Sequence, residues 1–314
     1  MMNKIYEEDS ISKQLYLLNK EKCLLASYLT SGYNSKLLRL TRLVNKIISE
    51  LHLRFRPSLF DKKISEISEY VGLDSCVYSG ELPKVIVYTC ITGKYDNFSE
   101  PLYKSPNCHY VAITDNQVDK QSNWEIISID RYADCIPAGL NNLQINRWIK
   151  MHPHLLFPEY DYSIYVDGNV TIVTDIMPII LRQHMGNKFL GIHLHYCREK
   201  IKSEANALLS CGKVNYKSKK KMMEQIESYY KKGYDDSVKL LEATIIVRKH
   251  NNERCIKIME DWWTEFISGI QRDQLSLPYV LWNNDVCMND IYLLGDNEYA
   301  NPRFFIVNHL NNKR

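Results

Sequence analysis

The sequence predicts an α/β protein, in which a GT-A-like, mainly parallel sheet has flanking helices and follows a helical N-terminal segment. From residue 84 onward, short apolar runs alternate with longer segments of helical character, and this alternation is typical of a parallel sheet with crossover helices. Before that point, apolar residues recur at helical spacing without any strand-like run. We therefore expect a helical segment over residues 1–80 and one α/β domain over residues 81–314.

The most distinctive part of the N-terminal segment is the run KLLRLTRLVNKIISELHLRFR at residues 36–56. Its apolar residues repeat at helical spacing, and six Lys or Arg residues make it strongly basic. Such a helix can lie on an anionic membrane surface or bind a partner. It can equally pack on the following domain with its basic face in water, and the sequence leaves both readings open.

The domain itself begins with the apolar run VIVYTCI, which is typical of a strand buried on both faces. The predicted strands are, in chain order, 85–91, 109–114, 124–129, 162–167, 188–195, 243–249 and 304–310. The predicted helices cover 139–152, 175–186, 203–232 and 252–268, and a further one begins at residue 272.

The amino-acid composition gives no support for a nucleic-acid-binding protein, a zinc ribbon or a disulfide-rich protein. The 40 Lys and Arg residues against 37 Asp and Glu residues leave a net charge of +3, which offers no argument for a nucleic-acid partner. The nine cysteines are odd in number and contain no Cys-x-x-Cys pair, so neither a zinc ribbon nor a disulfide framework is indicated. With no signal-peptide pattern and no apolar run of membrane-spanning length, we expect a cytoplasmic protein.

Polar residues follow the first two predicted strands. Gly93 and Lys94 come directly after the first strand, and Asp115 follows the second. Ligands bind beyond the carboxyl ends of strands in open α/β sheets. A single glycine is a weak signal, however, and an ordinary turn explains this loop equally well.

The strand at 162–167 delivers Asp167 to its end, and Gly168 and Asn169 follow. An Asp carboxylate and an Asn amide supply the oxygen ligands that Mg²⁺ and Mn²⁺ prefer. A divalent ion there can neutralise a diphosphate leaving group. We therefore expect Mn²⁺ or Mg²⁺ at this strand end, although Asp-Gly-Asn alone is often a β-turn.

Charged residues near this strand end can complete the site. Arg147 and Lys150 lie three apart on one face of the preceding helix and can contact a diphosphate or position Asp167. Asp273 begins a late helix, where it either caps that helix or faces the cleft to orient or deprotonate an acceptor hydroxyl. Next to it, Gln274 is expected to contact substrate, and Arg248 is expected to act with Asp273 in catalysis.

Three histidines are weaker candidates. His193 and His195 are expected on one face of a strand, where they can line a sugar pocket, and His309 lies in a late apolar strand whose end can return to the metal. No further Cys or His at ligand spacing supports a zinc site at the His-x-His pair.

Five motifs in this order resemble one family: VYTCITGKYD, YVAITDN, NRWIKMHPHLLFPEYDYSIYVDGN, RKHN and RDQLSLPYVLW. The sequence resembles the glycosyltransferase-like family catalogued as domain of unknown function 616, which includes bacterial surface-polysaccharide proteins and plant hexosyltransferase-like proteins. The resemblance covers residues 84–310, and residues 1–80 lie outside it. It implies a GT-A fold, with a nucleotide-binding half and an acceptor-binding half.

The resemblance also implies roles for individual residues. Residues 92–95 (Thr92, Gly93, Lys94 and Tyr95) and Asp115 would hold the nucleotide. Asp167 and Asn169 would replace the Asp-x-Asp metal motif, with Asn in place of the second Asp. Asp273 would be the acceptor-side acid and His309 a metal-side histidine.

The function expected from these observations is sugar transfer from a nucleotide-sugar donor to a glycan or lipid-linked glycan acceptor. The setting would be bacterial capsule, lipopolysaccharide or other surface-polysaccharide synthesis, with possible peripheral membrane contact through residues 36–56. Two alternatives remain open. One is a nucleotidyltransferase, for which no triphosphate loop is visible, and the other is a non-catalytic scaffold that docks on a membrane or a partner transferase.

Overall fold

The computed structural model describes residues 5–32, 77–93, 98–116, 121–212, 214, 216–295 and 297–307. The basic segment expected to be a helix at 36–56 lies outside these residues. Nothing in the described ranges is a helix both long enough and apolar enough to cross a membrane.

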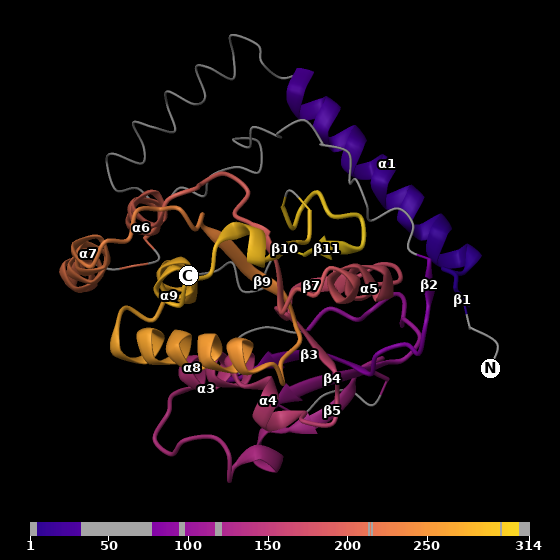
Figure 1. Cartoon of the computed structure of the whole chain (residues 1–314), viewed down its shortest axis with the longest axis horizontal. Coiled ribbons are helices and arrows are strands. Elements are labelled where there is room, and N and C mark those ends of the chain that lie inside the picture. The colour runs from indigo at the N-terminus through magenta and orange to yellow at the C-terminus, as the bar shows by residue number, and fades with distance from the viewer. Residues whose placement is uncertain are drawn as a thin grey trace.

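A seven-stranded sheet forms the centre of the described chain (Figure 1). Its strands, from one edge to the other, are β10 (Tyr292–Leu293), β8 (Leu190–Leu194), β9 (Leu241–Arg248), β6 (Tyr162–Val166), β3 (Val85–Ile91), β4 (Cys108–Thr114) and β5 (Glu125–Ser128). Neighbouring strands are parallel except where β9 pairs with β6 and β8. The predicted α/β class with a mainly parallel sheet is confirmed.

Helices cover both faces of this sheet and create two apolar cores. One core contains side chains from α3 (Asn142–Met151), α4 (Pro153–Leu156), α6 (Ile201–Ser210), α7 (Tyr216–Lys231), α8 (Glu253–Ser268) and α9 (Asp273–Asn283). The other contains α5 (Met177–Met185) and the two-stranded sheet of β7 (Val170–Ile172) and β11 (Phe304–Ile306). Short 3-10 turns lie at η2 (Ile129–Tyr132) and η3 (Met288–Asp290).

Several element boundaries differ from the prediction. The helix expected over 203–232 is divided into α6 and α7, because Gly212 adopts a positive φ of 65° just after α6 ends. The strand expected over 304–310 is described only as Phe304–Ile306, and it pairs with β7 rather than with the main sheet. The strand expected over 124–129 ends one residue early, where η2 begins.

The N-terminal helix α1 (Ser10–Gly32) packs against the α/β domain and is preceded by β1 (Ile5–Tyr6), which pairs with β2 (Tyr78–Ser79). Ser12 Oγ lies 2.5 Å from Thr174 Oγ1. Glu8 forms a 2.9 Å ion pair with Arg303, which is fully buried. Part of the N-terminal segment is thus fixed to the domain, and the boundary at residue 80 stays a prediction.

Candidate functional site

The carboxyl ends of β3, β4 and β6 lie at one edge of the sheet, because these three strands are parallel neighbours. This edge brings the segments after Ile91, Thr114 and Val166 side by side. The antiparallel strand β9 begins at the same edge, where the Asp167 amide donates to the Thr244 carbonyl at 2.9 Å. The topology thus gathers most of the predicted site residues within one region.

The loop after β3 is held by Asp115 and by the start of α3. The Gly93 amide donates to both carboxylate oxygens of Asp115, at 3.0 and 2.9 Å. Thr92 Oγ1 donates to the Asn142 carbonyl at 2.8 Å. Gly93 has a φ of +66°, which favours glycine, and a Cβ at this position would meet the Asn142 side chain, which would have to move. Lys94 and Tyr95, which were expected to contact the nucleotide, lie outside the described residues.

Two cations and two carboxylates form the centre of the site. Lys150 Nζ lies 2.7 Å from Asp273 Oδ2 and 4.0 Å from Asp167 Oδ1. Arg147 Nε lies 3.0 Å from the same Asp273 oxygen. Arg147 and Lys150 come from α3, Asp273 opens α9, and Asp167 follows β6, so three separate elements contribute. These four residues are called the charged quartet below.

The electrostatics of the charged quartet keep Asp273 ionised. Burial alone would raise the pKa of Asp273, but Arg147 and Lys150 hold it well below its ordinary value. Burial alone would lower the pKa of Arg147, and Asp273 and Asp167 raise it instead. A carboxylate with a strongly lowered pKa is a weak base at neutral pH. Asp273 is therefore better suited to bind and orient polar groups than to remove a proton.

Asp167 and Asn169 present oxygen atoms suited to a hard divalent cation. Asn169 Nδ2 donates to the Val307 carbonyl at 2.9 Å, which leaves the amide oxygen as an acceptor. The Asp167 side chain is one third exposed. Among the residues that the structure describes, no three His, Cys, Asp or Glu side chains come together as a metal site, and His309 lies outside them. Two oxygen ligands fit Mg²⁺, which commonly takes its other ligands from substrate phosphates and water.

Glu242 is a residue of this region that the sequence reasoning did not select. It is the second residue of β9, at the site edge, and accepts a hydrogen bond from Gln274 Nε2 and one from Thr244 Oγ1. Burial, together with the nearby Glu298, raises the pKa of Glu242 well above its ordinary value. Gln274 therefore lies beside a carboxyl group that favours its neutral form. A buried Glu at the start of an apolar strand was the only available signal.

Two predicted residues are displaced from the site. His193 has no exposed surface; Asn301 Nδ2 lies 3.0 Å from its Nε2, and burial lowers its pKa to about 3. A register shift between Ile192 and His193 interrupts the pairing of β8 with β9. His195, farther along, lies nearer the site, 3.7 Å from Glu242. His193 therefore does not line a sugar pocket in this structure.

Arg248 is the second displaced residue. It is fully buried, and its guanidinium contacts the Lys150 carbonyl and the Tyr88 hydroxyl. Because β9 is antiparallel to β6, Arg248 pairs with Ser163 near the start of β6, at the sheet edge opposite Asp167. Arg248 therefore lies away from the site edge in this structure, and its expected catalytic role stays a prediction.

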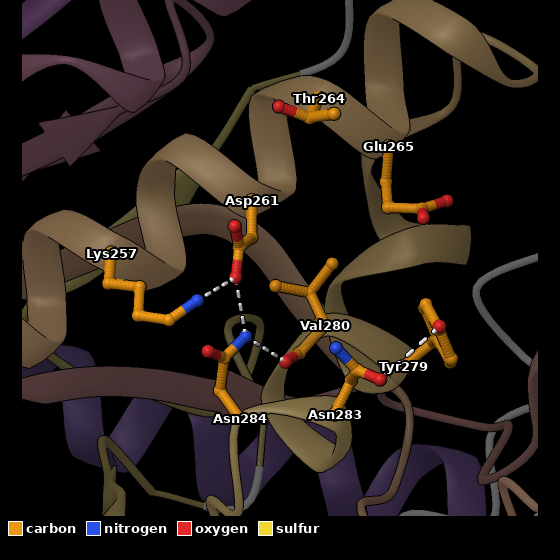
Figure 2. A pocket seen from close by; sticks show the side chains of 8 residues that line it. All are labelled: Lys257, Asp261, Thr264, Glu265, Tyr279, Val280, Asn283 and Asn284. Carbon is orange, nitrogen blue, oxygen red and sulfur yellow. Dashed lines mark hydrogen bonds and ion pairs between the residues drawn. The ribbon is translucent and has the colours of Figure 1, made fainter.

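A polar hollow of about 260 Å³ lies between α8 and α9. Figure 2 shows its lining residues, with Asp261 bonded to both Lys257 and Asn284. The hollow is lined by the far end of α9, from Tyr279 onward, whereas Asp273 is the first residue of that helix. It is therefore separate from the charged quartet.

Several solved structures resemble this chain, and they are glycosyltransferases. The galactosyltransferase LgtC, in complex with donor and acceptor sugar analogues, is 14% identical, with 66% of this chain and 72% of that chain covered and a TM-score of 0.34. The apo bifunctional glycosyltransferase WbbM is 12% identical, with 68% and 39% covered and a TM-score of 0.39. Apo mouse xyloside xylosyltransferase 1 is 8% identical, with 67% and 84% covered and a TM-score of 0.42.

The curated proteins include none that matches the sequence. A family model described as TOD1/MUCI70, glycosyltransferase-like domain, matches residues 74–301, which is well over half of the chain. The expected glycosyltransferase-like family is thereby confirmed, while the label of domain of unknown function 616 and the bacterial setting stay predictions. The chain belongs to the TOD1/MUCI70 glycosyltransferase-like family.

Proposed function

We propose that this protein transfers a hexose from a nucleotide-sugar donor to a glycan or lipid-linked glycan acceptor. The observation that carries the proposal is the charged quartet at the carboxyl edge of the sheet, in a chain of a glycosyltransferase-like family. Ligands bind at this edge in open α/β sheets. The expected setting is surface-polysaccharide synthesis in a bacterial cytoplasm.

The chemistry of the transfer explains why cations are needed here. As the bond between the anomeric carbon and the diphosphate oxygen breaks, its electron pair remains on the diphosphate, and negative charge develops there. Arg147 and Lys150 are already held in place by Asp273, so they can stabilise that charge without reorganising. The nucleotide itself would lie along the loop of Thr92 and Gly93, beside Asp115.

Asp273 orients hydroxyl groups of the substrates in this proposal. Its pKa is held well below the ordinary value by Arg147 and Lys150, despite burial, so it is poorly suited to accept the proton of an acceptor hydroxyl. Gln274, the next residue of α9, presents its amide to the same region and contacts the donor sugar. The sequence allowed either a base or an orienting role for Asp273, and the electrostatics favour the second.

Mn²⁺ or Mg²⁺ is proposed to bind through Asp167 and Asn169, with His309 as a third ligand. When bound, the ion would neutralise part of the diphosphate charge. Asp167 and Asn169 supply oxygen donors of the right chemistry, and the hydrogen bond from Asn169 Nδ2 to Val307 orients the amide oxygen away from that carbonyl. The proposed peripheral membrane contact would use residues 36–56.

Donor binding is tested by thermal denaturation of the full chain with UDP, GDP, CDP and ADP and their common sugars, with and without Mn²⁺. A ligand at a hundredfold excess over its Kd stabilises the native state by about 2.7 kcal/mol. One nucleotide family should raise the Tm, and Asp167→Ala should remove the metal-dependent part of the shift. The exposed Asp134 supplies the control variant Asp134→Ala, which should behave like the wild type. No shift with any of these compounds would contradict the proposal.

A further inference from the structure

The last turn of α3 is held by two buried side chains from the sheet. The final carbonyls of a helix have no partner within the helix. Tyr88, on β3, donates its hydroxyl to the Lys150 carbonyl at 2.9 Å and lies 3.3 Å from the Ile149 carbonyl. Arg248, on β9, donates to the same Lys150 carbonyl at 2.6 Å and to the Tyr88 hydroxyl at 2.6 Å. Together they cap the carboxyl end of the helix.

Burial of the Arg248 guanidinium costs free energy unless its positive charge is compensated. Arg248 has no exposed surface, and within the described chain no carboxylate forms an ion pair with it. A buried cation without a counter-charge is normally unfavourable. The carboxyl end of a helix carries partial negative charge, so the end of α3 supplies the compensation. The arrangement therefore fixes this helix end more tightly than an apolar contact would.

Lys150, whose carbonyl is held in this way, is also the residue whose ammonium lies near both carboxylates of the site. Helical side chains point back toward the amino end of their helix, so Lys150 extends from its fixed backbone toward the site edge. Its ammonium reaches Asp273 at 2.7 Å and Asp167 at 4.0 Å. It also lies 5.0 Å from the ring centroid of Tyr165. The Lys150 side chain is only 2% exposed, so it has little conformational freedom once its backbone is held in place.

We propose that Tyr88 and Arg248 are positioning residues of the transferase site. They hold the Lys150 carbonyl, and through it they place the Lys150 ammonium between Asp167 and Asp273. The importance of this for catalysis rests on the proposed function, in which Lys150 meets the donor diphosphate. The placement of Lys150 does not rest on it and can be measured without any substrate.

The placement is tested by competitive labelling of lysines with acetic anhydride, followed by mass spectrometry. In the wild type, Lys150 should react slowly compared with Lys220, whose side chain is 85% exposed. Tyr88→Phe removes only the hydroxyl, and Arg248→Lys keeps the charge but loses the two-pronged contact. Each should raise the labelling rate of Lys150 relative to Lys220 by about tenfold, a size typical of coupled neighbours.

Two matched controls separate positioning from general loosening. Tyr234 is a buried tyrosine whose hydroxyl donates to the Val238 carbonyl at 2.7 Å, and Arg303 is a fully buried arginine. Tyr234→Phe and Arg303→Lys should leave the labelling ratio of Lys150 unchanged. If Arg248→Lys fails to fold, Tyr88→Phe decides alone. An unchanged ratio in folded Tyr88→Phe, or an equal rise in the controls, would overturn the inference.

The link to function is tested with the nucleoside diphosphate, among UDP, GDP, CDP and ADP, that binds the wild type. Tyr88→Phe should weaken its binding in the wild-type background and have no further effect in Lys150→Met, because the loss passes through Lys150. Equal weakening in both backgrounds would overturn the inference. If no diphosphate binds the wild type, the proposed function fails, and the labelling ratio still decides the placement of Lys150.

Discussion

Replacement of Lys150 by Met removes one charge from the centre of the site with little change in side-chain length. The lost contact is the 2.7 Å bond to Asp273. Both partners are largely buried, with side-chain exposures of 2% and 13%. Arg147 still lies 3.0 Å from Asp273, so the carboxylate keeps one cation.

The contact that Arg147 keeps with Asp273 sets the expected loss of stability in Lys150→Met. Leaving a buried charge without any partner costs about 3–5 kcal/mol, whereas losing one charge-assisted hydrogen bond costs about 1.5–3 kcal/mol. Since Arg147 stays in contact with Asp273, the second case applies. We expect Lys150→Met to lower the free energy of unfolding by about 2 kcal/mol at pH 7.

The pH dependence supplies a second signature. Arg147 and Lys150 hold the pKa of Asp273 below its ordinary value of 3.8, against the opposing effect of burial. A lowered carboxyl pKa contributes stability that is present above about pH 3.8 and is lost as the pH falls from there through the folded-state pKa. Lys150→Met weakens this contribution. The stability difference from the wild type should therefore shrink only as the pH falls well below 3.8, toward the folded-state pKa of this carboxyl group.

Urea denaturation followed by tryptophan fluorescence, at pH 7 and in a series that falls from pH 3.8 to about pH 2, measures both effects. With a slope of about 2 kcal/mol/M, the midpoint should fall by roughly 1 M at pH 7. The control is Lys257→Met, which removes a 2.7 Å ion pair to Asp261 whose lysine is 65% exposed. That change should cost at most about 0.5 kcal/mol. Equal losses in the two variants, or a Lys150→Met deficit that is independent of pH, would refute the reasoning.

Two further predictions concern buried or strained positions. Burial raises the pKa of Asp175 to about 6, so the contribution of Asp175 to the free energy of unfolding is full below about pH 3.8 and is lost as the pH rises through 6. Asp175→Asn should therefore be more stable than the wild type at pH 8, by up to about 3 kcal/mol. Identical pH profiles of Tm for the two proteins would contradict this. Gly93→Ala should cost about 1–3 kcal/mol, because Gly93 has a positive φ and its added Cβ would meet Asn142. Gly139→Ala, at a φ of +81° with nothing within 4 Å, should cost less in the same urea titration, and equal costs would show that the contact with Asn142 is unimportant.

The sequence predicted the strands at the centre of the sheet well. The runs at 85–91 and 162–166 are mostly apolar because both faces of these strands are covered, and that pattern is visible without a structure. Parallel neighbours necessarily present their carboxyl ends at one edge. Asp115 and Asp167 were therefore predictable as residues of one site.

The direction of β9 was not predictable from its composition. An apolar run has no direction, and only the pairing with β6 shows that β9 is antiparallel. The start of β9 therefore brings Glu242 to the site, while Arg248 lies at the opposite edge and contacts the carboxyl end of α3. The unexpected places of Arg248 and Glu242 have this single cause. The contact between α1 and residues near Thr174 likewise joins positions too distant in sequence for local patterns to reveal.

The most direct test of the central claim is the release of nucleoside diphosphate from the donor that stabilises the wild type, in the presence of Mn²⁺ and with the acceptor replaced by water. Slow hydrolysis by a transferase requires the same stabilisation of the leaving diphosphate as transfer does. The account predicts measurable release by the wild type and by Asp134→Ala, and a loss of about a hundredfold or more in Lys150→Met and Asp167→Ala. Release that is unaffected by both substitutions, from folded protein, would contradict the assignment of the charged quartet as the transferase site.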